Sequence, residues 1–234
     1  MRSVGEGGYR TRHTVWAPSY RTVPSRFPPI GLFDRVADPA DLDAVYAIEA
    51  ITNDRIRDAS GVLALVPANE RISGAGTTPI MAAFTHLNPD GTRFSDGSFG
   101  VYYCAKSAQT SLAEVRHHKE EFLRQTRQGP IRLELRMYLS DLDARLVDVR
   151  KDAALHDPDD YAPGQKLGSA CRAEARDGIL YRSVRDAGGV CAAVFRPRVL
   201  SPVRQSKHYA FHFDGERIFA IDESSSVWVA PKTT

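Results

Sequence analysis

The chain has few cysteines and no long apolar run. Cys104, Cys171 and Cys191 are odd in number, widely spaced and outside any Cys-x-x-Cys pair, so the sequence predicts neither a disulfide framework nor a metal site of the zinc type. A run of eighteen apolar residues is missing, which argues against a membrane-spanning helix. Residues 1–8 also lack the apolar core of a signal peptide. We therefore expect a soluble, cytoplasmic protein that binds no membrane.

An excess of charge of either sign is also missing. Lys and Arg number 31 against 29 for Asp and Glu, which gives a formal net charge of +2 in 234 residues. Such a balance provides little long-range attraction to phosphate backbones, so we expect no direct binding of nucleic acid. Hydrophobic residues make up 42% of the chain, as is usual for a globular protein with a packed core.

The N-terminal part is rich in proline. Four prolines fall within residues 1–30, and proline is excluded from helix interiors and central strands. We therefore predict an extended N-terminal arm over 1–30. One domain then covers 31–223, with an insertion at about 58–92, and a C-terminal tail covers 224–234.

Periodicity predicts a mixture of helices and strands in the body of the chain. Asp38-Pro39 is typical of a helix start, which places a helix at 39–57. Gly, Pro, Asn and Thr are frequent between 61 and 96 and indicate a mostly irregular segment. Beyond it, helical periods and alternating apolar residues predict helices at 107–127 and 163–176, strands at 99–105, 131–139, 179–181 and 190–195, and a hairpin at 209–221. Since helices and hairpins do not alternate regularly, the fold class is mixed α/β, more α+β than doubly wound.

Two stretches have the composition of a functional motif without its pattern. Gly74-Ala-Gly76 lacks the Gly-Lys-Ser/Thr ending of a nucleotide-binding loop, so a surface turn is the better interpretation. The adjacent His117 and His118 point about 100° apart on a helix and cannot share a metal as an i, i+4 pair does. Neither stretch predicts a site.

A third group of residues carries a recognisable spacing. It consists of Arg93 in Gly-Thr-Arg-Phe-Ser-Asp-Gly, Tyr103 on a short strand, Glu114 in the following helix, and Ser183 in Gly-Ile-Leu-Tyr-Arg-Ser-Val-Arg-Asp-Ala-Gly-Gly. With these phrases the sequence resembles the RES domain family, which is named for its characteristic Arg, Glu and Ser. Phe33-Asp-Arg35-Val is similar to the opening strand of that family, so the resemblance runs from about residue 33 to residue 195.

The resemblance implies an enzyme that acts on NAD, in a single domain with a fold related to the ADP-ribosylating toxins. Several family members are toxins of type II toxin–antitoxin pairs that degrade NAD as NAD phosphorylases or glycohydrolases, and their usual partner is an Xre-like antitoxin. NAD is then the substrate, inorganic phosphate or water the acceptor, and no further cofactor is implied. Two alternatives stay open: a protein ADP-ribosyltransferase, and a non-catalytic module that binds NAD or an antitoxin.

The residue types suit cleavage of the nicotinamide–ribose bond. Glu114 is the candidate to stabilise the cationic, oxocarbenium-like transition state. Arg35 and Arg93 are candidates to bind the pyrophosphate, because guanidinium groups bind phosphate through paired, charge-assisted hydrogen bonds. Tyr103 offers an aromatic face to nicotinamide, and Ser183 offers a hydroxyl to the ribose or the amide.

Overall fold

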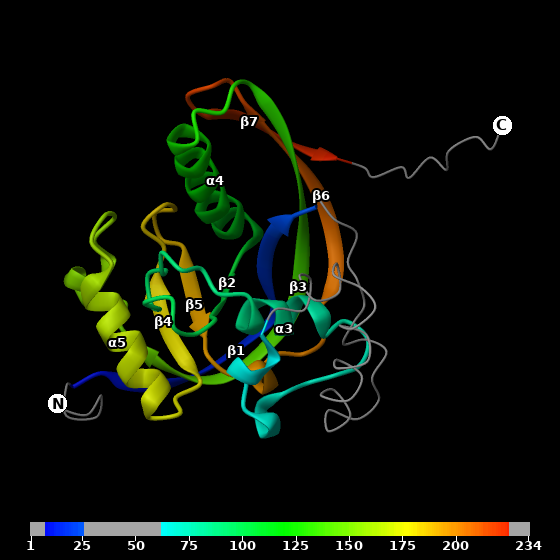
Figure 1. The fold of residues 1–234 in the computed structure, drawn as a ribbon. Coiled ribbons are helices and arrows are strands. Elements are labelled where there is room, and N and C mark those ends of the chain that lie inside the picture. Colours follow the sequence, from blue (N-terminus) through cyan, green and yellow to red (C-terminus); the bar gives the residue numbers. More distant parts are fainter. Residues whose placement is uncertain (1–7, 26–61, 225–234) are drawn as a thin grey trace.

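The computed structural model describes residues 8–25 and 62–224. Seven strands of these residues form one sheet with the order β1-β2-β5-β4-β3-β6-β7, and β1 also pairs with β3 (Figure 1). The strands are β1 (Arg10–Pro24), β2 (Tyr102–Ala105), β3 (Ile131–Asp148), β4 (Gly178–Arg182), β5 (Val190–Val194), β6 (Arg204–Phe213) and β7 (Ile218–Ser224). The predicted mixed α+β single domain is confirmed.

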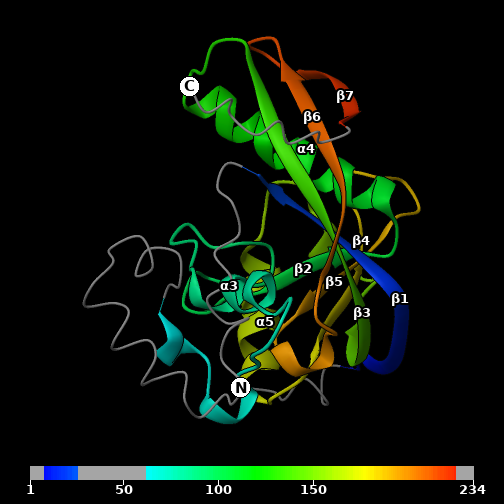
Figure 2. The ribbon, with the colours of Figure 1, turned by 90° about the vertical axis from the view of Figure 1, so that its right-hand side faces the viewer.

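The additional pairing of β1 with β3 closes part of the sheet into a ring. β1 pairs antiparallel with both β2 and β3, and β4 pairs parallel with β3. The ring therefore contains β1, β2, β5, β4 and β3, while β6 and β7 extend from the other end of β3 as an antiparallel hairpin. β3 belongs to both parts because it is 18 residues long (Figure 2).

The N-terminal segment is extended, as predicted, but it is a strand of the ring. The expectation that proline keeps this segment out of the sheet was wrong for Arg10–Pro24. Pro18 lies where the register of β1 against β3 shifts, between Trp16 and Ser19, and Pro24 is the last residue of the strand. A proline is tolerated at a bulge or at a strand end because no ladder hydrogen bond needs its missing N–H.

Three α-helices of the described chain cover the sheet: α3 (Thr78–Thr85), α4 (Ala108–Gln125) and α5 (Ala162–Ala173). Apolar residues of α3 pack with Trp16 and Leu142 on one face of the ring, and residues of α5 pack with Ile179 and Tyr181 on the other. α4 packs on β3, β6 and β7, within the curve of these strands (Figures 1 and 2). Among the described residues, we find no helix with the length and apolarity needed to cross a membrane.

The predicted elements beyond residue 99 are present and most lie close to their expected positions, but the strand expected at 131–139 extends to Asp148 as β3. The helix expected at 107–127 is α4, which begins after Ser107, whose Oγ accepts the backbone N–H of Thr110 at 3.1 Å. The hairpin expected at 209–221 is β6–β7. Amphipathic period and a capping serine are local signals, so the sequence is sufficient to predict these elements.

The segment at 62–96 is more ordered than its composition indicates. It holds the short 3-10 helices η3 (Leu63–Leu65) and η4 (Ala68–Glu70) before α3, and Ile80 and Met81 of α3 are fully buried. The prediction of a mostly irregular segment was therefore wrong at α3. The helix predicted at 39–57 and the Arg35 segment lie outside the described residues.

Candidate active site

Glu114 and Ser183 are in direct contact, although 69 residues separate them in the sequence. The hydroxyl of Ser183 donates a hydrogen bond to Oε1 of Glu114 over 2.5 Å. Glu114 lies in the second turn of α4, and Ser183 directly follows β4. Glu114 Oε2 accepts no hydrogen bond from any described residue, which leaves it available to a ligand.

The loop after β4 holds the Ser183 hydroxyl in a fixed direction. Ser183 Oγ accepts the backbone N–H groups of Arg185 at 3.1 Å and Asp186 at 2.9 Å. The backbone N–H of Ser183 donates to the Gly189 carbonyl at 2.9 Å, which closes the loop. With two N–H donors on its lone pairs, the hydroxyl has its own proton free to donate, and this proton goes to Glu114.

Tyr103 is anchored to the two neighbours of Arg93. Its hydroxyl accepts the backbone N–H of Phe94 at 3.0 Å and shares a hydrogen bond of 2.8 Å with Thr92 Oγ1. Burial raises the pKa of Tyr103 to about 12, although both hydrogen bonds act in the opposite direction. The phenol is therefore neutral at physiological pH, and the bonds fix the segment that carries Arg93.

Arg93 is buried, with 8% of its surface exposed. Its Nη1 donates to the carbonyl oxygens of Leu155 at 3.3 Å and Asp157 at 2.7 Å, and its guanidinium carbon lies 4.5 Å from the centre of the Tyr161 ring. Nε and Nη2 make no hydrogen bond with a described residue. The side chain is thus held by one nitrogen and a ring, without a carboxylate partner among the described residues.

Tyr181 connects the Arg93–Tyr103 pair with the Glu114–Ser183 pair, and the sequence analysis missed it. Its ring lies edge-on to Tyr103, with 6.5 Å between centroids, and it stands two positions before Ser183 in the sequence. Burial raises its pKa well above the usual value, Glu114 adds to this effect and Arg93 opposes it. Tyr181, which looked like an ordinary strand residue in the sequence, is therefore in contact with Tyr103 and within electrostatic range of both Glu114 and Arg93.

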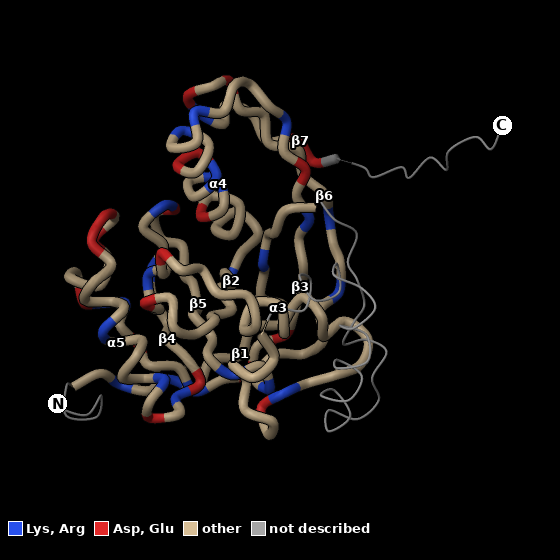
Figure 3. The backbone as a smooth tube through the Cα atoms, in the orientation of Figure 1, with Lys and Arg blue, Asp and Glu red and all other residues tan. Residues whose placement is uncertain are grey.

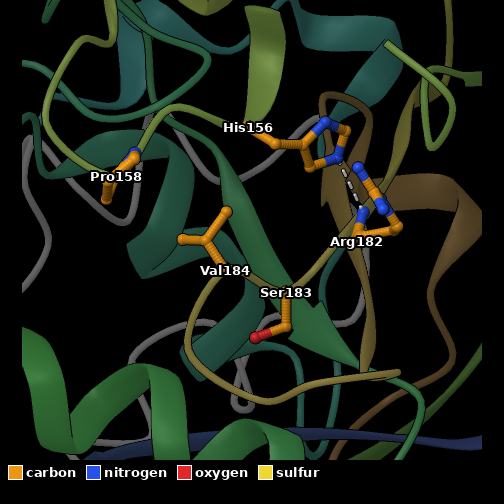
Figure 4. Close-up of a pocket in the computed structure, with 5 residues that line it drawn as sticks. All are labelled: His156, Pro158, Arg182, Ser183 and Val184. Atoms are coloured by element: carbon orange, nitrogen blue, oxygen red, sulfur yellow. Dashed lines mark hydrogen bonds between the residues drawn. The ribbon is translucent and has the colours of Figure 1, made fainter. Parts of the chain in front are cut away.

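A pocket of about 320 Å³ opens beside Ser183, and Figure 4 shows the residues that line it. This volume is at the lower end of ligand pockets, which measure roughly 300–1,000 Å³, so the pocket fits one part of a dinucleotide. The lining residues are His156, Pro158, Arg182, Ser183 and Val184.

His156 in this pocket has a defined tautomer. Its Nδ1 lies 2.5 Å from the carbonyl oxygen of Asp152 and therefore carries the proton, while Nε2 accepts the backbone N–H of Arg182 at 3.0 Å. Burial lowers the pKa of His156, which agrees with a neutral ring. Single histidines without a motif gave no signal in the sequence.

A second arginine near the site lies on β1, and Arg35 lies outside the described residues. Nη1 of Arg21 donates to the Tyr103 carbonyl oxygen at 2.9 Å, and Nε of Arg21 is buried without a hydrogen-bond partner among the described residues. Lys and Arg are interspersed with Asp and Glu along the described backbone (Figure 3). Among the described residues, the arginines near the site come from β1 (Arg21), from the loop before β2 (Arg93) and from the end of β4, where Arg182 lines the pocket.

Three comparisons relate this chain to known proteins. A model of the RES domain family matches residues 70–214, a range that includes Arg93, Tyr103, Glu114 and Ser183 but not Arg35. An uncharacterized protein, y4oC of Sinorhizobium fredii (strain NBRC 101917 / NGR234), is 31% identical over 214 residues, which cover 88% of this chain and 89% of that protein. A chain in the crystal structure of the M. tuberculosis MbcT-MbcA toxin-antitoxin complex aligns with a TM-score of 0.47 and 14% identity, over 88% of this chain and 87% of that one.

Proposed function

The chain belongs to the RES domain family, and from that premise we propose that it cleaves the nicotinamide–ribose bond of NAD. The observation that carries the proposal is the 2.5 Å hydrogen bond from Ser183 to Glu114. It joins the Glu and the Ser of the family pattern in one place, next to a pocket.

Glu114 is the group that we propose to act on the ribose. As the bond to nicotinamide breaks, positive charge develops on the ribose, and a fixed carboxylate stabilises this charge more than it stabilises neutral ribose. The bond from Ser183 fixes Oε1 and leaves Oε2 toward the substrate. An orientation set before the substrate binds costs no reorganisation during the reaction.

Arginine and tyrosine side chains are proposed to bind the rest of the dinucleotide. Arg93 and Arg21 each have two guanidinium nitrogens without a hydrogen bond to a described residue. Arg35, which lies outside the described residues, stays a proposal from the family pattern. The partly exposed Tyr103 ring is proposed to stack on nicotinamide, which would place the leaving group near Tyr181.

The acceptor and the biological setting are further parts of this proposal. Inorganic phosphate or water would accept the ADP-ribosyl group, which makes the enzyme a phosphorylase or a glycohydrolase. We propose that it is the toxin of a toxin–antitoxin pair, restrained by a partner protein that covers the site. This part rests on the family resemblance, and expression of the protein in cells tests it.

The experiment is an incubation of the purified protein with NAD, with and without phosphate, followed by separation of the products. We expect release of nicotinamide, together with ADP-ribose in water or its phosphate ester when phosphate is the acceptor. Glu114→Gln should reduce turnover on the order of a hundredfold or more, because an amide cannot balance cationic charge. NAD binding should persist in this variant.

Glu121→Gln is the matched control, since Glu121 is exposed on the same helix and, within the described part of the chain, bonds only to Arg124 and Gln125. Its turnover should stay within about threefold of wild type. In cells, wild type should lower NAD and stop growth, and Glu114→Gln should do neither at equal protein level. Labelled protein in place of free products would favour protein ADP-ribosylation, and turnover by Glu114→Gln equal to that of Glu121→Gln would contradict the proposed role.

A further inference from the structure

We infer that Asp186 and Thr110 are positioning residues, which hold the Ser183 hydroxyl on Glu114. This inference rests on the proposed function and names what sets the geometry of its site. Neither residue belongs to the Arg, Tyr, Glu and Ser pattern. Their effect on the reaction would pass entirely through Ser183.

The side chain of Asp186 is bound to the first turn of α4. Oδ2 accepts the hydroxyl of Thr110 at 2.7 Å, and Oδ1 accepts Nε2 of Gln109 at 3.2 Å. The same residue donates its backbone N–H to Ser183 Oγ at 2.9 Å. Asp186 therefore links the start of α4 directly to the hydroxyl that contacts Glu114.

The two attachment points on α4 are one helical turn apart. Thr110 and Glu114 are four residues apart and lie on the same side of the helix, so the loop contacts the helix at Asp186–Thr110 and at Ser183–Glu114. Two contacts on successive turns fix both the distance and the rotation of the loop. A single contact would leave the loop free to turn about it.

The donors and acceptors of this network have one consistent order. The Thr110 hydroxyl gives its proton to Asp186, so in its 2.8 Å contact with Ser107 Oγ it must accept. Ser107 Oγ in turn accepts the Thr110 backbone N–H. Thr110 is only 2% exposed, so water has little access to its hydroxyl, and the two side-chain bonds orient the half-buried carboxylate of Asp186.

The loop also packs closely enough to require glycine. A Cβ built on Gly189 would lie 2.8 Å from Thr110 Cγ2 and 2.9 Å from both Thr110 Oγ1 and Asp186 Oδ2. The backbone at Gly189 thus rests directly on the Thr110–Asp186 contact. This arrangement accounts for the second glycine of the Gly188-Gly189 pair.

The test measures kcat and KM for NAD cleavage in Thr110→Val, which keeps the shape and removes the hydroxyl. We expect kcat to fall about tenfold to a hundredfold, as for a misplaced reacting group, with KM changed less than about threefold. Thr110→Ser should recover wild-type kcat within about threefold, because the hydroxyl returns. Asp186→Asn, which keeps the backbone N–H bond to Ser183, should also lower kcat.

The matched control is Thr126→Val at the other end of α4, where the hydroxyl bonds to the Phe122 carbonyl oxygen at 2.8 Å. This variant should keep wild-type kcat. In a Ser183→Ala background, Thr110→Val should cause less than about a twofold further loss, since its effect passes through Ser183. An undiminished loss in that background, or equal kcat in Thr110→Val and Thr126→Val, would overturn the positioning role. Wild-type protein without NAD cleavage would instead overturn the proposed function and this inference with it.

Discussion

The two faces of the ring differ in what their polar groups do, and the adjacent residues Tyr102 and Tyr103 show the difference. Tyr102 is fully buried on the α3 face, and its hydroxyl has no hydrogen-bond partner among the described residues. Tyr103, on the α5 face, has two partners. The α3 face is packed as a core, whereas the α5 face uses its hydroxyl groups to fix the segment that carries Arg93.

The α5 face nevertheless depends on close packing as well. A Cβ on Gly168 of α5 would lie 2.0 Å from the Phe94 carbonyl oxygen, and on the other face a Cβ on Gly100 would lie 2.4 Å from the Ala83 carbonyl oxygen in α3. α5 therefore approaches the Arg93–Phe94 backbone through Gly164 and Gly168, and α3 approaches the backbone at Gly100. Both faces are thus closely packed, and the hydrogen bonds of Tyr103 distinguish the α5 face.

The largest effect on stability is expected from Gly168→Ala. Alanine usually favours a helix by about 1 kcal/mol over glycine, but here the methyl group would meet the Phe94 backbone, so we expect a net loss of about 1–3 kcal/mol. Gly129→Ala is the control, because nothing lies within 4 Å of its Cβ. Denaturant unfolding measures both variants, and equal stability would show that α5 can move away from Phe94 at little cost.

The comparison of the two tyrosines predicts a difference in stability of at most the same size. Tyr103→Phe leaves the Phe94 N–H without its acceptor and should cost about 1–3 kcal/mol of unfolding free energy. Tyr102→Phe removes an unpaired buried hydroxyl and should be neutral or slightly stabilising. Chemical denaturation of the two variants beside wild type decides the point. Similar losses in both would mean that the hydrogen bonds of Tyr103 add no stability.

The smallest expected effect is a dependence on pH at His156. Its neutral ring is required, because protonated Nε2 would face the Arg182 N–H that it now accepts. Burial lowers the pKa of His156 below the usual value of about 6.5. The unfolded chain thus binds a proton first as the pH falls, and this contribution to stability is present above about pH 7 and decreases toward pH 5.

His156→Gln should make the unfolding free energy depend less steeply on pH between 5 and 7, even though the variant is less stable than wild type at pH 7.5. The measurement is the unfolding free energy of both proteins at several pH values from 5 to 8. A wild-type slope that persists unchanged in the variant would assign the dependence to other groups.

Local signals were enough to predict much of the fold. The helical period at 107–127, the alternation at 131–139 and the hairpin pattern at 209–221 predicted elements that the structure confirms as α4, the first half of β3 and β6–β7. The prolines led to a wrong prediction for β1. The bulge at Pro18 depends on the pairing of β1 with β3, which the sequence of β1 alone does not reveal. The apolar residues of α3 gave no clear helical pattern in the sequence, because turn-forming residues are frequent around them.

The sequence by itself determined the resemblance to the RES domain family, and that resemblance predicted that Arg93, Tyr103, Glu114 and Ser183 share a site. Only the tertiary structure decided how they meet. Ser183 reaches Glu114 because the loop after β4 rests on the first turn of α4 through Asp186 and Thr110. Such contacts join residues about 70 or more positions apart, and no local periodicity encodes them, because they follow from the closure of the ring and the packing of helices on it.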